Sequence, residues 1–387
     1  MPDVLMDCTG HRVDWTSLGG IGLRARELAA EIARVAGVTV FSPGSLPERL
    51  GPGVRLVTRE SAWAAELRRS DIVYSFDSPS PERLASVAGS GLPMIVENAP
   101  PLEHALYPSL ARRADRESRY RETVEAYRRQ LAGGAFFTCR SAVERATLVA
   151  NLCLTGRVTV AAMRASGALD GLVTTIPVGF SESAAEAARL RLAEAGREGA
   201  FRDGVFRVVW SGGLWTYLDP LFALESARIA RSRGVPVELV FLYGRENPDN
   251  AAVLSGLLGA VERYGCGDYV TVRQTPLGRA EYFRVLAGAS ALLCVGRRGV
   301  ENDTCVRLRI RDSRLFGLPT VVDRHGPTFD ELARDGLAHG ADDPEEGAAA
   351  LAVIHQRRGE RAPLDAYAYR RTARDLCAWI EKRKGER

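Results

Sequence analysis

The residues of this sequence best suited to phosphate chemistry lie first in the stretch FRVVWSGGLWTYLDPLFALESARIARSRG. Its opening apolar run stops at Gly212 and Gly213, and an amphipathic helical pattern begins a few residues later. Asp219 is well placed as the N-cap of that helix, with Pro220 at its first position. Free backbone N–H groups and the helix dipole at such a start can hold a phosphate without a basic side chain. A plain tight turn explains the pattern equally well, and the loop itself contains no Lys or Arg.

A second glycine-rich loop lies near the start of the chain, in DWTSLGGIGLRARELAAEI. Gly19, Gly20 and Gly22 precede a helical pattern there. The spacing is not the GxGxxG fingerprint directly after a strand, which disfavours a nicotinamide-dependent dehydrogenase. The GxxxxGK[ST] pattern is absent from the whole sequence, which disfavours a P-loop NTPase.

The third segment, GRRGVENDTCVRLRIRDSRLFGLPTVV, contains the positive charge that the loop after Gly212 and Gly213 lacks. Arg307, Arg309 and Arg311 alternate with apolar residues, and Asp312 follows them. Arginine guanidinium groups bind phosphate oxygens in a bidentate manner, and a carboxylate can accept hydrogen bonds from a ribose diol. The segment is therefore a candidate phosphate and ribose site, and a solvated helix with salt bridges is the alternative interpretation.

Other candidate side chains lie beside these segments. Glu103 and His104 follow a predicted strand in ENAPPLEHALYP and could accept a proton from an acceptor hydroxyl, although an ordinary loop histidine fits as well. Trp15, Trp215 and Tyr217 flank the two glycine loops, where they could stack on a sugar ring or anchor the loops. The sequence has no HxH, DxD or HExxH pattern, so no metal site is predicted.

Composition indicates an ordinary globular protein. The 387 residues are 46% hydrophobic and 26% charged, and no window approaches the roughly 18 apolar residues of a membrane helix. A net charge of +4, from 52 Lys and Arg against 48 Asp and Glu, gives no reason to expect a nucleic-acid partner. The start of the sequence has no secretory signal pattern, and seven scattered cysteines are typical of reduced thiols. We therefore expect a cytoplasmic protein.

Short apolar runs alternate with helical patterns, which predicts an α/β fold with parallel sheets. The strands expected in the first half are Asp3–Asp7, Val38–Phe41, Val54–Val57, Ile72–Ser75, Met94–Glu97, Ala135–Cys139 and Val173–Pro177. Those expected in the second half are Phe206–Trp210, Val237–Tyr243, Val270–Arg273, Ala291–Val295 and Thr320–Asp323. Helices are expected at Leu23–Val35, Pro220–Arg233, Ala251–Tyr264, Arg279–Ala287, Arg307–Leu315, Phe329–Ala333 and Tyr367–Lys384, and a polar helix with a linker at Ser181–Asp203. The predicted domains are 1–180 and 181–364, with a C-terminal helix within 365–387 that packs back on the first.

Four segments together carry a resemblance to a known family: SLGGIGLRARELA, FFTCRSAVERATLVANLCLTGRV, VVWSGGLWTYLDPL and VENDTCVRLRIRDSRLFGLPTVV. In order and spacing the chain resembles GT-B glycosyltransferases of the large retaining group, similar to family 4. It is most similar to a bacterial subgroup whose second domain opens with a Gly-Gly-x-Trp…Asp-Pro loop. The resemblance implies the GT-B fold, in which two Rossmann-like domains face each other across a cleft. The first domain would bind the acceptor and the second a nucleotide-diphosphate sugar, with no other cofactor and no metal.

The resemblance also implies roles for individual residues. Gly19, Gly20 and Gly22 would lie over the donor phosphates and the reacting sugar, beside the acceptor-side residues Trp15 and Glu103. Gly212 and Gly213 would form the diphosphate loop, while Gly244 and Arg273 would lie near the nucleobase and Asp312 would bind the ribose. Glu301 would read the donor sugar, and the residues expected to be catalytic are Glu301, Arg309 and His104.

The sequence departs from the wider group at the phosphate and sugar positions. The Arg and Lys of the usual diphosphate loop fall here on Gly213 and about Leu218, and the position eight before Asp312 is Thr304 rather than a glutamate. We therefore expect Arg307 and Arg309 to neutralise the diphosphate. The alternative is a weakened or altered donor site, or a chain without transferase activity.

The function expected from the resemblance is transfer of a sugar, with retention, from a nucleotide-diphosphate sugar to a small polar acceptor through O, N or S. The Arg-, Ala- and Gly-rich composition is compatible with an antibiotic or saccharide biosynthetic pathway in bacteria. A GT-B nucleotide-sugar epimerase and a non-catalytic nucleotide-sugar binding protein are the alternatives. The expected partners are the small-molecule donor and acceptor, and a homodimer is left open.

Overall fold

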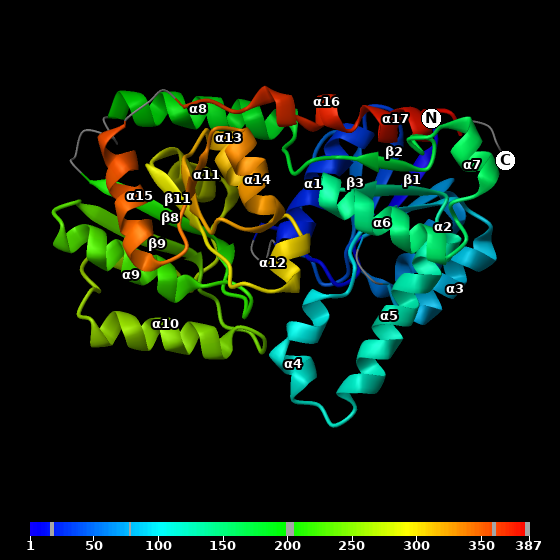
Figure 1. Cartoon of the computed structure of the whole chain (residues 1–387). Helices are drawn as coiled ribbons and strands as arrows, with labels where there is room; N and C mark the ends of the chain where they lie inside the picture. The colour runs from blue at the N-terminus through cyan, green and yellow to red at the C-terminus, as the bar shows by residue number, and fades with distance from the viewer. Residues whose placement is uncertain (16–18, 77–78, 199–204, 358–360, 384–387) are drawn as a thin grey trace. The chain divides into compact units, whose positions relative to one another are not determined.

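The structure is a computed structural model that describes residues 1–15, 19–76, 79–198, 205–357 and 361–383 (Figure 1). The chain divides into two compact units. The first consists of Met1–Ala105, Arg113–Glu182 and Ala366–Arg387, and the second of Leu106–Arg112 and Ser183–Asp365. A short segment between two elements of the first unit therefore belongs to the second.

The first unit is built on a seven-stranded parallel sheet. Its strands are β1 (Asp3–Asp7), β2 (Gly37–Phe41), β3 (Val54–Val57), β4 (Ile72–Ser75), β5 (Met94–Glu97), β6 (Phe136–Cys139) and β7 (Val173–Thr175). The strand order is β3-β2-β1-β4-β5-β6-β7, so the chain changes direction across the sheet between β1 and β4. Such a reversal creates a crevice at the carboxyl ends of the two strands, where ligands of α/β proteins bind.

Helices cover both faces of this sheet. They are α1 (Gly20–Ile32), α2 (Trp63–Arg69), α3 (Pro81–Ser90), α5 (Arg116–Gly133), α6 (Ala142–Leu154), α7 (Val160–Ala165), α16 (Tyr369–Thr372) and α17 (Arg374–Glu381), with 3-10 turns at Glu60–Ala62, Glu103–Leu106 and Asp365–Tyr367. One core cluster joins β1 and β2 to α1 and to Leu376, Trp379 and Ile380 of α17, while the other joins the opposite face to α3, α5 and α6. The indole of Trp379 stacks on Phe136, with 5.0 Å between ring centroids. The end of the chain is thus part of the core of the first unit.

The second unit repeats the design with a six-stranded parallel sheet of order β10-β9-β8-β11-β12-β13. Its strands are β8 (Phe206–Gly213), β9 (Val237–Tyr243), β10 (Val270–Val272), β11 (Ala291–Cys294), β12 (Thr320–Val322) and β13 (Ala338–Gly340). Its helices are α4 (Pro108–Ala111), α8 (Glu182–Glu198), α9 (Pro220–Ser232), α10 (Ala251–Arg263), α11 (Arg279–Ala287), α12 (Val300–Thr304), α13 (Ile310–Phe316), α14 (Gly326–Arg334) and α15 (Pro344–Gln356). The change of direction lies here between β8 and β11.

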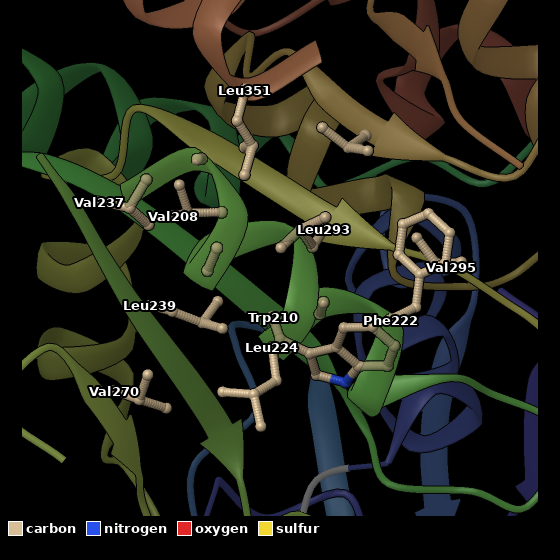
Figure 2. Packing of buried hydrophobic residues seen from close by; sticks show 14 of the residues in the cluster. Val208, Trp210, Phe222, Leu224, Val237, Leu239, Val270, Leu293, Val295 and Leu351 are labelled. Atoms are coloured by element: carbon tan, nitrogen blue, oxygen red, sulfur yellow. The ribbon is translucent and has the colours of Figure 1, made fainter. Parts of the chain in front are cut away.

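The core of the second unit forms between this sheet and the helices α9, α10 and α15. Figure 2 shows Trp210 of β8, Leu239 of β9 and Leu293 of β11 among its side chains, together with Phe222 of α9 and Leu351 of α15. The alternating inward residues of β8, Phe206, Val208 and Trp210, are each at most 2% exposed. This packing fixes the end of β8 relative to the neighbouring strands β9 and β11.

The predicted α/β class with parallel sheets is confirmed, and most predicted elements exist. The differences lie at their ends: β8 extends to Gly213, α1 begins at Gly20, and Tyr367–Lys384 contains two short helices, α16 and α17, rather than one. Glycine is disfavoured in both helices and strands, so the prediction placed Gly212 and Gly213 outside the strand and Gly20 outside the helix. The prediction omitted β13, and residues 199–203 of the predicted linker lie outside the described part of the chain. No helix in the described ranges combines the length and apolarity that crossing a membrane requires.

Candidate functional site

The candidate site of the second unit lies at the change of strand order between β8 and β11, where the loops that follow these two strands are bonded to each other. The N–H of Asp219 donates to the carbonyl of Val295 at 3.0 Å, and the N–H of Arg297 donates to the carbonyl of Tyr217 at 3.0 Å. Leu218 and Gly296 form an isolated antiparallel bridge between these bonds. The two loops therefore form one continuous rim at the position where doubly wound sheets bind ligands.

Arg309 lies against the end of β8, beside the first glycine of the predicted diphosphate loop. A Cβ placed on Gly212 would be 3.7 Å from Cγ of Arg309. The guanidinium carbon lies 4.4 Å from the centroid of the Tyr243 ring at the end of β9, and Nη1 donates to the hydroxyls of Tyr243 at 3.3 Å and Tyr282 at 3.4 Å. The structure thus brings together Gly212 and Arg309, which are far apart in the sequence.

Asp312 is linked to Arg309 through the hydroxyl of Tyr282. It is fully buried, and its Oδ1 accepts hydrogen bonds from the Tyr282 hydroxyl at 2.5 Å and from Arg311 Nη1 at 3.0 Å. Its Oδ2 is buried without a hydrogen-bond partner. A ribose diol could reach this carboxylate only if the buried arrangement changed, so the predicted ribose contact stays a prediction.

The charges in this cluster shift the pKa values of its members. Burial, followed by the nearby Asp312 carboxylate, raises the pKa of Tyr282 well above its ordinary value. Burial also raises the pKa of Tyr243, although Arg309 opposes the effect. Burial acts to lower the pKa of Arg309, but Tyr243, Tyr282 and Asp312 outweigh it and the pKa is raised. Both tyrosines stay protonated and Arg309 stays positive near neutral pH.

Arg307, the other arginine assigned to phosphate, is used within the protein. Its Nη1 and Nη2 form a bidentate pair with Asp323 at 2.6 and 2.9 Å. Its Nε donates to Asn302 Oδ1 at 2.9 Å, and Nη1 also donates to the carbonyl of Cys294 at 2.7 Å. The side chain is 8% exposed. Through these bonds Arg307 joins the ends of β11 and β12 to α12.

The N-terminus of α9 lies next to the carboxylate of its own N-cap residue, Asp219. Asp219 is the N-cap, as predicted, and its Oδ1 accepts the N–H of Phe222 at 3.1 Å. Arg297 Nε lies 3.9 Å from the other carboxylate oxygen. A phosphate at this helix start would meet the Asp219 carboxylate as well as the backbone amides, and the two negative charges would repel each other.

The remaining residues assigned to the donor site lie around the same carboxyl edge. The Trp215 indole packs on Gly213, because a Cβ placed there would be 2.7 Å from its Nε1. Gly244 donates its N–H to the carbonyl of Arg273 at 2.8 Å, and Arg273 Nη1 pairs with Glu281 at 2.8 Å. Glu301 lies in α12, where the Cys305 thiol sulfur is 3.6 Å from its Oε2.

The first unit has a comparable junction at the start of α1. Gly19 is the N-cap with no side-chain capping bond, and the helix begins at Gly20, earlier than predicted. Two arginines of α1 make contacts with other parts of the first unit. Arg24 donates from Nε to Glu97 Oε1 at 2.7 Å, and the guanidinium carbon of Arg26 lies 5.3 Å from the centroid of the Trp15 ring.

The other acceptor-side residues of the first unit lie on α1 and on the 3-10 turn Glu103–Leu106. Gly22 is buried within the first turn of α1. Glu103 and His104 are half-buried on the 3-10 turn Glu103–Leu106. Each lies in the element or loop where the sequence placed it, and their roles stay predictions.

Sequence reasoning missed Tyr243, Tyr282 and Asp323, which hold the two arginines. Tyr243 and Asp323 had a usable signal, because each stands at the carboxyl end of a predicted strand. Tyr282, on the predicted helix Arg279–Ala287, had none. Within the residues that the structure describes, no group of three His, Cys, Asp or Glu side chains could hold a metal ion.

Comparison with known proteins identifies the fold. No protein-family model and no curated protein sequence matches the chain. Solved structures do: trehalose-6-phosphate synthase OtsA aligns over 100% of this chain and 99% of its own, with a TM-score of 0.61 and 12% identity. Anabaena HepE in complex with UDP and glucose aligns over 100% and 99%, with a TM-score of 0.60 and 13% identity. WaaG, a glycosyltransferase of lipopolysaccharide biosynthesis, aligns over 98% and 94%, with a TM-score of 0.57 and 12% identity. The two parallel α/β sheets therefore form a GT-B fold, as the sequence predicted.

Proposed function

We propose that this protein is a retaining glycosyltransferase that takes a sugar from a nucleotide-diphosphate donor and transfers it to a small polar acceptor in bacterial natural-product or saccharide biosynthesis. The observation that carries the proposal is the position of Arg309. It lies beside Gly212 at the change of strand order in the second sheet of a GT-B fold, and its guanidinium is held by Tyr243 and Tyr282.

The chemistry requires stabilisation of the leaving diphosphate more than it requires a protein nucleophile. In a retaining transfer through an oxocarbenium-like transition state, negative charge develops on the diphosphate as the sugar departs. A pre-oriented cation in a partly dehydrated crevice stabilises that charge without reorganising during the reaction. Arg309 meets this requirement, because two tyrosine hydroxyls and a ring face fix its guanidinium before any ligand arrives. Removal of one such donor typically raises the barrier by about 3–4 kcal/mol.

We assign Arg307 to positioning rather than to direct phosphate binding. Its Nε and both terminal nitrogens donate to Asn302, Asp323 and the Cys294 carbonyl, so a phosphate would have to displace a bidentate ion pair. Through these bonds Arg307 fixes the loop that leads to Glu301, the residue proposed to read the donor sugar. Glu103 and His104 are the proposed acceptor-side residues, with His104 as general base.

A nucleoside diphosphate panel tests the donor assignment. Thermal midpoints are measured with UDP, GDP, dTDP and ADP, starting with UDP because HepE was solved with UDP and glucose. One of them should raise the midpoint by mass action, and Arg309→Ala should weaken its affinity about a hundredfold. Arg309→Lys should recover only part of that loss, because an ammonium cannot reproduce the planar fork. Arg324→Ala, which removes an exposed arginine paired with Asp342 and Glu346, is the matched control and should bind normally. Equal affinity in wild type and Arg309→Ala would refute the assignment.

A non-catalytic nucleotide-sugar binding protein is the second candidate, and one observation favours it. At the position where the wider group has a sugar-binding glutamate, Thr304 uses its hydroxyl to donate to the Val300 carbonyl at 2.6 Å. Release of nucleoside diphosphate from the matching sugar nucleotide separates the two candidates. Turnover, with the product retaining the donor's anomeric configuration, supports the transferase, and tight binding without turnover supports the binding protein.

A further inference from the structure

Seven residues that lie between elements of the first unit belong by their contacts to the second. The chain leaves the first unit after Ala105 and returns to it at Arg113, and Leu106–Arg112 is grouped with the second unit. The segment contains the short helix α4. Neither the sequence patterns nor the family resemblance gave this segment a role.

The start of the segment packs on the loop after β8. The ring centroids of Tyr107 and Trp215 are 5.8 Å apart with an interplanar angle of 30°, and Thr216 Oγ1 donates to the carbonyl of Leu106 at 3.1 Å. Trp215 in turn rests on Gly213, where no Cβ would fit beside its indole. A line of direct contacts therefore runs from Tyr107 to the end of β8.

The rest of the segment is bonded to the loop after β9. The N–H of Ser109 donates to Asp249 Oδ1 at 2.7 Å, and Arg112 Nη2 donates to the carbonyl of Pro248 at 3.1 Å. This loop is itself ordered by side-chain bonds, because Asn247 Oδ1 accepts the N–H groups of Asp249 and Asn250. The Ser109 N–H thus binds the Asp249 carboxylate of a loop whose conformation is already fixed by the Asn247 side chain.

The two loops follow the strands that end beside Arg309. Gly212 lies near the end of β8 and Tyr243 at the end of β9, and Arg309 contacts both. We propose that Leu106–Arg112 is a positioning element of the donor site, which holds the loops after β8 and β9 in the geometry that binds a nucleoside diphosphate. The inference rests on the proposed function for its ligand. Trp215 then serves as an anchor between Tyr107 and Gly213, which leaves little of its ring face for a sugar.

Two pairs of variants test the two contacts separately. Tyr107→Ala removes the ring that packs on Trp215, and Tyr107→Phe keeps it. Asp249→Ala removes the acceptor for the Ser109 N–H, and Asp249→Asn keeps a carbonyl oxygen there. Tyr120→Ala in α5 is the matched control, since it removes a half-buried tyrosine of the first unit.

Two readouts are used on the full chain: amide hydrogen exchange of residues 214–219 and 247–250, and the dissociation constant for the diphosphate selected from the UDP, GDP, dTDP and ADP panel. Tyr107→Ala should speed exchange in 214–219 and Asp249→Ala in 247–250. Each should weaken diphosphate binding about tenfold, the scale of one aromatic contact or hydrogen bond. Tyr107→Phe, Asp249→Asn and Tyr120→Ala should behave like the wild type.

The outcomes separate this inference from the proposed function. Unchanged exchange in both alanine variants overturns the inference, whatever the affinity. Faster exchange with unchanged diphosphate affinity overturns it too, because the loops would then move without consequence for the donor. If the wild type binds no diphosphate, the proposed function fails together with the donor role of the segment, while the exchange data still decide whether the segment anchors the loops.

Discussion

The two units contain the same sequence device, a glycine-rich turn that leads into a helix, and they use it differently. At the start of α1 the N-cap is Gly19, with no side-chain capping bond and no acidic residue in the first turn. At the start of α9 the N-cap is Asp219, whose carboxylate accepts a backbone N–H. The N-cap residue therefore supplies no side-chain acceptor to the free amides of α1, whereas the Asp219 carboxylate occupies one of the amides of α9.

The arginines near the two junctions have different kinds of partner. Arg24 of α1 is 3% exposed and paired with Glu97, which also accepts the hydroxyls of Tyr74 at 2.8 Å and Thr138 at 2.6 Å. Its charge is neutralised and its role is to fix α1 on the sheet. Arg309 donates to the hydroxyls of Tyr243 and Tyr282, and the Tyr282 hydroxyl in turn donates to Asp312.

The comparison shows that a glycine-rich turn alone does not define a phosphate site. In the first unit the available groups are backbone amides, and in the second the positive charge comes from a side chain more than ninety residues away in sequence. The two junctions are therefore expected to respond differently to substitution, and the following variants measure that difference, beginning with the largest effect.

Glu97→Ala should destabilise the first unit by about 3–5 kcal/mol, because it leaves Arg24 buried without its counter-charge and removes an acceptor of the buried Tyr74 and Thr138 hydroxyls. The midpoint of urea unfolding measures the change. Glu125→Ala removes an exposed carboxylate paired with Arg128 and Arg129 and should leave the midpoint unchanged. A small effect of Glu97→Ala would mean that Arg24 can find another partner, and the contrast with Arg309 would weaken.

Gly213→Ala should lower the free energy of unfolding by about 1–3 kcal/mol, because the alanine Cβ would overlap the Trp215 indole, which packs against Tyr107. Gly19→Ala places its Cβ in open space and should destabilise the protein less, by at most about 1 kcal/mol, because alanine is a poorer N-cap than glycine. Thermal unfolding of the two variants compares the junctions directly. If Gly19→Ala nevertheless weakens diphosphate binding, the ligand approaches the backbone of α1 closely; if binding is unaffected, that approach is not needed.

Asp219→Ala should destabilise the protein by about 1 kcal/mol through loss of the N-cap, and Asp219→Asn should lose much less, because an amide oxygen also caps. Both remove the carboxylate beside the α9 amides, so neither should weaken nucleoside diphosphate binding, and a modest gain is expected. Calorimetric titration with the selected diphosphate checks this. Weaker binding by Asp219→Asn would show that the carboxylate itself contacts the ligand.

The sequence by itself determined the parallel α/β class, nearly all of the strands and the cap at Asp219, because these depend on local apolar periodicity and on side-chain-to-backbone bonds within one turn. It also selected the segment that contains Arg309. The sequence could not separate Arg307 from Arg309, since both alternate with apolar residues in the same run and differ only in what faces them after folding.

Tertiary structure decided which arginines form ion pairs with carboxylates inside the protein. Asp323 at the end of β12 neutralises Arg307, and Glu97 at the end of β5 neutralises Arg24, whereas tyrosines from β9 and α11 meet Arg309. Only the tertiary fold brings Leu106–Arg112 onto the loops after β8 and β9. The physical reason is that ion pairing, burial and ring contact act over a few ångströms in space, between residues whose separation along the chain carries no information about that distance.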